Sequence, residues 1–141
     1  MEWIKLYTDY AIFGVLGLMS LVSLALSIER MLYFRSLNVE QYDNKHLLEN
    51  DLTQNLTVLS TIGSNAPYVG LLGTVIGIMV TFYDMGQHGK LDNTAILVGL
   101  SFALKATALG LLVAIPTLMF YSSFVRKVDT HMNLWKSKYE A

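Results

Sequence analysis

The sequence lacks cysteine altogether, contains two prolines, and has charged side chains at only 15% of its 141 positions. The absence of cysteine excludes disulfides, thiolate metal sites and cysteine nucleophiles. Soluble domains carry about 25% charged residues, so little of this chain is suited to a surface in water. The formal net charge of −1 gives no electrostatic basis for binding nucleic acid. We therefore expect no nucleic-acid partner, no metal and no cofactor.

Hydrophobic residues, by contrast, make up 53% of the sequence, and many of them gather in three long runs. Each run spans or nearly spans the roughly 20 residues that a helix needs to cross a bilayer. We predict an all-α membrane protein with three transmembrane helices and long cytoplasmic helical extensions. An enzyme is not expected, because the sequence has no HExxH motif, no paired carboxylates within a span and no nucleophile–base pair.

The three runs divide the chain into six segments. They are an N-terminal interfacial segment with the first transmembrane helix (1–35), a cytoplasmic loop and helix (36–65), the second transmembrane helix (66–84), an outer loop (85–93), the third transmembrane helix (94–125) and a cytoplasmic tail (126–141). Lysine and arginine lie mostly between the first two runs and after the third, whereas the opposite side has only Lys5 and Lys90. By the positive-inside rule, the N-terminus faces outward and the C-terminus faces the cytoplasm. The first residues show neither a basic start nor a small-residue cleavage site, so no signal peptide is expected.

The second span carries a stripe of small residues within the uncharged run APYVGLLGTVIGIMVTF. At about 100° per residue, five of them share an arc of roughly 100°. They are Gly70, Gly73, Thr74, Gly77 and Thr81. In water each glycine would weaken a helix by about 1 kcal/mol relative to alanine. In a membrane, small residues let another helix approach closely, so this face is predicted to contact other helices.

The third span repeats the pattern around Thr107. Six small residues fall within about 100° of it, namely Gly99, Ala103, Ala106, Gly110, Ala114 and Thr117. Pro116 is expected to kink this helix and to leave a backbone carbonyl free. A hydroxyl in hydrocarbon costs free energy unless it is hydrogen-bonded or wetted. Thr74 and Thr107 therefore either bond back to carbonyls four residues earlier or form one functional surface together.

Other polar residues allow two interpretations each. Glu29 and Arg30, at the end of the first span, form either an anchor at the lipid headgroups or a gate. His46 is interpreted as a solvated surface residue. His88 is interpreted as a plain loop residue rather than a metal ligand, because no second ligand stands at a suitable spacing.

The second and third spans, APYVGLLGTVIGIMVTF and GLSFALKATALGLLVAIP, resemble the ExbB/TolQ/MotA family of proton-channel proteins. SIERMLYF, at the end of the first span, fits the same family. Three spans with a short loop are most similar to the ExbB branch, with TolQ close to it. The flagellar stator branch has four spans and a large cytoplasmic insertion, which this chain lacks.

The resemblance implies a ring, a homopentamer, in the bacterial inner membrane around the helices of two ExbD-like subunits. The same resemblance implies that the loop over 85–93 lies in the periplasm. Proton flow would drive work on a TonB-like protein, which energises outer-membrane transporters. Thr74 and Thr107 match the family's threonines on the proton path, whereas the proton-carrying aspartate belongs to the one-span ExbD-like partner. Gly70, Gly73, Gly77, Ala103, Gly110 and Ala114 would pack the helices. Two alternatives stay open: a TolQ-like subunit for envelope maintenance, and a scaffold that stabilises a partner without lining a proton path.

Two positions on the third span stand out against the family. Many members carry a glutamate five residues before the third-span threonine, and here that position is Phe102. Lys105, three residues later, lies about 160° from Thr107 on a helical wheel. Its ammonium either reaches the outer interface, or pairs with a polar or acidic group of a neighbouring subunit, or contacts the aspartate of the partner. Replacement of Lys105 by methionine separates the first of these alternatives from the other two.

Overall fold

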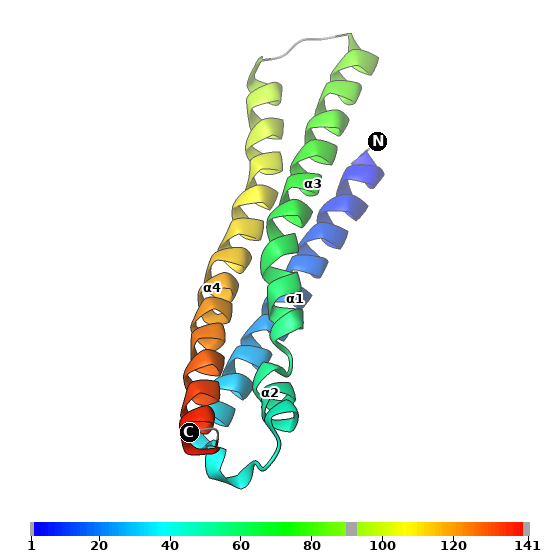
Figure 1. The fold of residues 1–141 in the computed structure, drawn as a ribbon. Helices are drawn as coiled ribbons and strands as arrows, with labels where there is room; N and C mark the ends of the chain where they lie inside the picture. The colour runs from blue at the N-terminus through cyan, green and yellow to red at the C-terminus, as the bar shows by residue number, and fades with distance from the viewer. Residues whose placement is uncertain (1, 90–92, 140–141) are drawn as a thin grey trace.

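The computed structural model describes residues 2–89 and 93–139, and the described chain is helical with short connections (Figure 1). The elements in order are α1 (Glu2–Ser36), the 3₁₀ turn η1 (Val39–Gln41), α2 (Lys45–Thr53), α3 (Leu56–His88) and α4 (Asn93–Tyr139). α1, α3 and α4 are long and apolar enough to cross a membrane. The prediction of an all-α protein is confirmed, and so is that of three helices long and apolar enough to span a membrane.

α3 and α4 run antiparallel and pack together over much of their length, and α1 packs against both (Figure 1). α2 lies at the end of the bundle that also holds the C-terminal part of α4. At 1.5 Å per residue, α1 and α3 are each about 50 Å long and α4 is about 70 Å long. The bilayer core is about 30 Å thick, so α4 continues well beyond it as a helix.

The helices extend past the segment boundaries expected from the sequence. α3 begins at Leu56 and passes through Pro67 without a break, since buried Leu59 and Ala66 hold it against its neighbours on the N-terminal side of the proline. At the other end α3 continues to His88 and stops where Gly89 adopts a φ of 65°, a conformation that favours glycine. The predicted loop over 85–93 is therefore too long, and residues 90–92 lie outside the described part.

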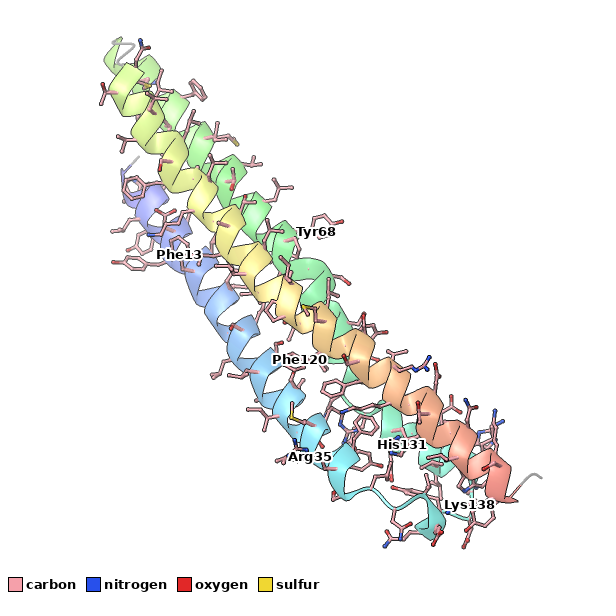
Figure 2. All side chains as sticks on the ribbon, turned by 90° about the vertical axis from the view of Figure 1, so that its left-hand side faces the viewer. Phe13, Arg35, Tyr68, Phe120, His131 and Lys138 are labelled. Atoms are coloured by element: carbon pink, nitrogen blue, oxygen red, sulfur yellow. The ribbon has the colours of Figure 1, made fainter. Side chains whose placement is uncertain are left out.

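Two apolar clusters hold the bundle together. The one near α2 is called here the cytoplasmic cluster, after the side of the membrane that the sequence predicts for it. It is made of large side chains from all the long helices and α2: Phe34, Leu48, Leu52, Leu56, Leu59, Phe124, Val128, Met132 and Trp135. The other, called the membrane cluster, is smaller: Ile12, Leu16, Ala66, Ala106 and Ala114. Figure 2 shows Phe120 and His131 on the side of α4 that faces α1, where the rings of His131 and Phe34 lie 5.5 Å apart.

Arg30 joins α1 to α2 from inside the cytoplasmic cluster and is only 1% exposed. Its guanidinium pairs with Glu29 at 2.6 Å and donates to the backbone carbonyl of Asp51 at 2.7 Å. It also donates to the carbonyl of Leu52 at 3.3 Å and lies 4.2 Å from the centroid of the Tyr33 ring. These carbonyls are at the C-terminal end of α2, where a positive charge is stabilised by the helix dipole. The headgroup-anchor interpretation is wrong for Arg30, because its charge is buried within the chain.

Candidate functional site

The two small-residue stripes face each other between α3 and α4 within one chain. A Cβ atom added at Gly70 would lie 2.6 Å from the carbonyl oxygen of Ala106, and one added at Gly110 would lie 2.6 Å from that of Ala66. The two backbones are therefore in direct contact at these positions, and no larger residue fits without moving a helix. This is the close approach that small residues permit in a membrane.

The other members of the stripes extend this contact along the helices. A Cβ at Gly77 would lie 2.9 Å from that of Ala103, and a Cβ at Gly73 would lie 3.0 Å from Cγ2 of Ile12 on α1. Ala114 is 2% exposed and belongs to the membrane cluster. The same added Cβ at Gly73 would lie 2.9 Å from that of Ala106 on α4, so all three long helices meet at Gly73 as well.

Thr74 and Thr107 come together across this interface, and their hydroxyl groups are hydrogen-bonded to each other. The Thr74 hydroxyl also lies 2.8 Å from the carbonyl oxygen of Ala103 on α4 and 3.3 Å from that of Gly70 on its own helix. Thr74 is 6% exposed, whereas Thr107 is half-buried. Thr74 is therefore buried and bonded across the interface, whereas Thr107 reaches the exposed rim of the paired helices α3 and α4.

A pair of hydroxyls can donate and accept hydrogen bonds at the same time, and it does so without carrying charge. The pair is thus suited to contact either a protonated or an ionised carboxyl group presented at the rim. Back-bonding to Gly70 is only part of the bonding of Thr74, because its shorter contact is with Ala103 on the neighbouring helix.

Phe102 and Lys105 lie elsewhere on α4, and both are exposed. Phe102 lines a cleft of about 470 Å³ near the C-terminal end of α3 and the N-terminal end of α4, together with Thr81 and Asp84. Lys105 forms no ion pair with any residue in the described ranges.

A second hydroxyl contact, which the sequence reasoning missed, joins α1 to α4. Oγ of Ser23 and Oγ1 of Thr117 lie 2.6 Å apart, and both residues are buried. Ser20, Ser23 and Ser27 line a cavity of about 220 Å³ between these helices. The serines recur at spacings of three and four residues on α1, so they share one face of the helix. This spacing could have predicted a polar contact on that face from the sequence.

The residues described do not bring three or more His, Asp or Glu side chains together in a way that could hold a metal. His46 is exposed. The side chain of His88 lies outside the described part.

Comparison with known proteins places this arrangement in a family. Residues 24–137 match the MotA/TolQ/ExbB proton channel family. The chain is 56% identical over 129 residues to the biopolymer transport protein ExbB of Helicobacter pylori, covering 92% of this chain and 89% of that protein. It is 52% identical over 137 residues to the ExbB of Aquifex aeolicus, covering 97% and 93%. The ExbB of Pseudomonas putida is 42% identical over 78 residues, which are 55% of this chain and 24% of that protein. The chain belongs to the MotA/TolQ/ExbB proton channel family, is most similar to its ExbB members, and is a transport protein rather than an enzyme.

Proposed function

We propose that this chain is the ring-forming subunit of a proton channel, with Thr74 and Thr107 on the proton path. The observation that carries the proposal is the hydrogen-bonded hydroxyl pair across α3 and α4, whose Thr107 member is half-buried at the rim. Several copies, five in our proposal, surround the transmembrane helices of an ExbD-like partner. The rim of each α3–α4 pair faces that partner.

The proton itself is carried by an aspartate of the partner in this proposal. Phe102 occupies the position where many relatives have a glutamate, so this chain offers no carboxyl group there. A carboxylate accepts a hydrogen bond from a hydroxyl, and a protonated carboxyl donates one. The threonine pair therefore contacts both states of the aspartate without retaining the proton.

The work done by proton flow is, in our proposal, the energising of outer-membrane transport through a TonB-like protein. The relatives in Helicobacter and Aquifex, which this chain matches over most of their length, are named biopolymer transport proteins, and this supports the assignment. A TolQ-like role in envelope maintenance is the alternative within the family. The location is the inner membrane, with the N-terminus in the periplasm and the C-terminal end of α4 in the cytoplasm.

Proton conductance of the complex co-expressed with its one-span partner tests the hydroxyl assignment. The variant T74V/T107V removes both hydroxyls at nearly constant volume, and we expect conductance to fall at least tenfold. T81V is the matched control, because Thr81 is also buried on α3 but bonds to the carbonyl of Gly77 on its own helix at 2.9 Å. Unchanged conductance in T74V/T107V, with normal complex formation, would remove these residues from the proton path.

A scaffold that holds the partner without lining a path is the second candidate. It is favoured by one observation: the Thr74 hydroxyl already has a backbone acceptor 2.8 Å away, on Ala103. Under this alternative, deletion of the chain lowers the level of the partner, while T74V/T107V conducts as the wild type does. The same conductance measurement therefore separates the two functions.

A further inference from the structure

Lys105 places an ammonium group on an exposed and mostly apolar face of a helix long and apolar enough to span a membrane. Ionisable residues at such positions are costly, and they pair with other groups or with water. No described residue forms an ion pair with it. The question is which group of opposite charge lies within reach.

The contacts between the helices fix which residues share a height in the bundle. Ser23 on α1 meets Thr117 on α4, and Ile12 and Ala106 both lie against Gly73. In each pair, the residue on α4 follows the residue on α1 by 94 positions in the sequence. The two helices therefore run parallel, with each α1 residue level with the α4 residue 94 positions later. Lys105 is thus level with Ala11.

Asp9 is the described carboxylate closest to this height. It lies two residues from Ala11, which corresponds to about 3 Å along the helix axis. Glu29 lies 18 residues away from Ala11, or about 27 Å. On α3 the pairing of Thr74 with Thr107 puts Asp84 about 12 Å from the height of Lys105 along the bundle. Among residues whose side chains are described, the remaining carboxylates are in or near η1 and α2, or on α4 beyond the apolar run.

Asp9 and Lys105 also lie on the same side of the contact between α1 and α4. Ser20 and Ser27 line the 220 Å³ cavity, and Asp9 precedes them by 11 and 18 residues, close to whole numbers of helical turns. Leu112 and Pro116 line the same cavity from α4, and Lys105 precedes them by seven and 11 residues. Asp9 and Lys105 therefore continue the cavity-side faces of α1 and α4 toward the N-terminal ends of both helices.

We propose that Asp9 and Lys105 of the same chain form an ion pair across the α1–α4 contact in the membrane. Their charged groups are apart in the structure, and the flexible four-carbon stem of lysine closes the pair by a change of rotamer. The half-buried position of Asp9 and the exposed position of Lys105 leave both side chains room to turn. The pair fixes the outer half of α1 to α4, and it neutralises the charge that Lys105 brings into the apolar run.

Cross-linking tests the position of the pair, and the natural absence of cysteine provides a clean background. D9C/K105C, treated with a short bis-thiosulfonate reagent in native membranes, is expected to give a cross-link within one chain. D9C/L104C is the matched control, since Leu104 has nearly the same height but lies on a different face of α4. A cross-link between two chains, or equal reaction in the control, overturns the proposal.

Stability of the complex in lipid nanodiscs tests the charge pairing independently of proton flow. D9N and K105M each leave one charge unpaired, and each is expected to lower the midpoint of thermal unfolding by about 4–8 °C. The exchanged variant D9K/K105D is expected to recover at least half of that loss. No loss in the single variants, or an exchanged variant less stable than both of them, overturns the proposal. Because conductance is not measured, this outcome is separate from that of the proton-path hypothesis.

Discussion

The membrane cluster and the cytoplasmic cluster hold the same helices together in opposite ways. Around the membrane cluster, glycine and alanine bring backbones into contact, and many large side chains, such as Leu72 and Met79, point outward. In the cytoplasmic cluster, aromatic and branched side chains fill the space between helices, and Arg30 is enclosed among them. Around the membrane cluster the helices therefore approach closely but leave large apolar side chains exposed. In the cytoplasmic cluster, side chains of the same chain fill the space between its helices.

The largest effect is expected from removing the buried charge of the cytoplasmic cluster. R30M leaves the C-terminal carbonyls of α2 without their donor and Glu29 without its partner, so we expect a loss of about 3–5 kcal/mol of stability. Denaturant unfolding in micelles, together with hydrogen exchange of α2 amides, measures it. R35M is the control, since Arg35 is exposed at the end of α1 (Figure 2). Equal stability of R30M and R35M would contradict the role given to Arg30.

The next largest effect is expected at Gly70, where the backbones of α3 and α4 are in contact. G70A places a methyl group 2.6 Å from the carbonyl oxygen of Ala106, so α3 and α4 must separate. We expect a loss of about 1–3 kcal/mol, measured by the same unfolding assay. G86A is the control on the same helix, because no described atom outside the nearby backbone of α3 lies within 4 Å of its added Cβ. There the higher helix propensity of alanine predicts unchanged or slightly increased stability.

A smaller effect is expected from one hydrogen bond at the edge of the cytoplasmic cluster. Nε1 of Trp135 donates to the carbonyl of Tyr42 at 2.8 Å and so joins α4 to the segment between η1 and α2. W135F retains most of the apolar contact and removes the donor, with an expected loss of about 1–2 kcal/mol. W3F, at a position 64% exposed, serves as the control and should leave stability unchanged.

The smallest effect concerns an exposed ion pair. Lys138 donates to the Glu40 carboxylate at 2.5 Å and lowers the pKa of that carboxyl. Because the folded-state pKa lies below the ordinary value, the contribution of the pair is complete above the ordinary pKa of glutamate and is lost as the pH falls through the lowered one. K138M should return the Glu40 pKa to its ordinary range, as NMR titration would show, with little change in stability. An unchanged pKa in K138M would exclude Lys138 as the cause.

Periodicity was sufficient to predict the three spans and the two small-residue stripes, because both depend only on residues close in sequence. It could not give the meeting of Thr74 with Thr107, since a helical wheel contains no information about the antiparallel register of two helices. The role of Arg30 escaped prediction for the same reason: its acceptors are on α2, 21 and 22 residues later. The passage of α3 through Pro67 depends on packing against the neighbouring helices, which local propensity does not include.

The 47 residues of α4 connect the two regions mechanically. Thr107 and Trp135 lie 28 residues apart on this single rod, a separation of about 42 Å. A tilt of about 5° at the threonine would displace the tryptophan by about 4 Å over that length. Pro116 lies between them, where its missing amide hydrogen bond makes the rod easiest to bend. A small tilt of α4 near Thr107 therefore becomes a larger displacement at Trp135, in the cluster next to α2.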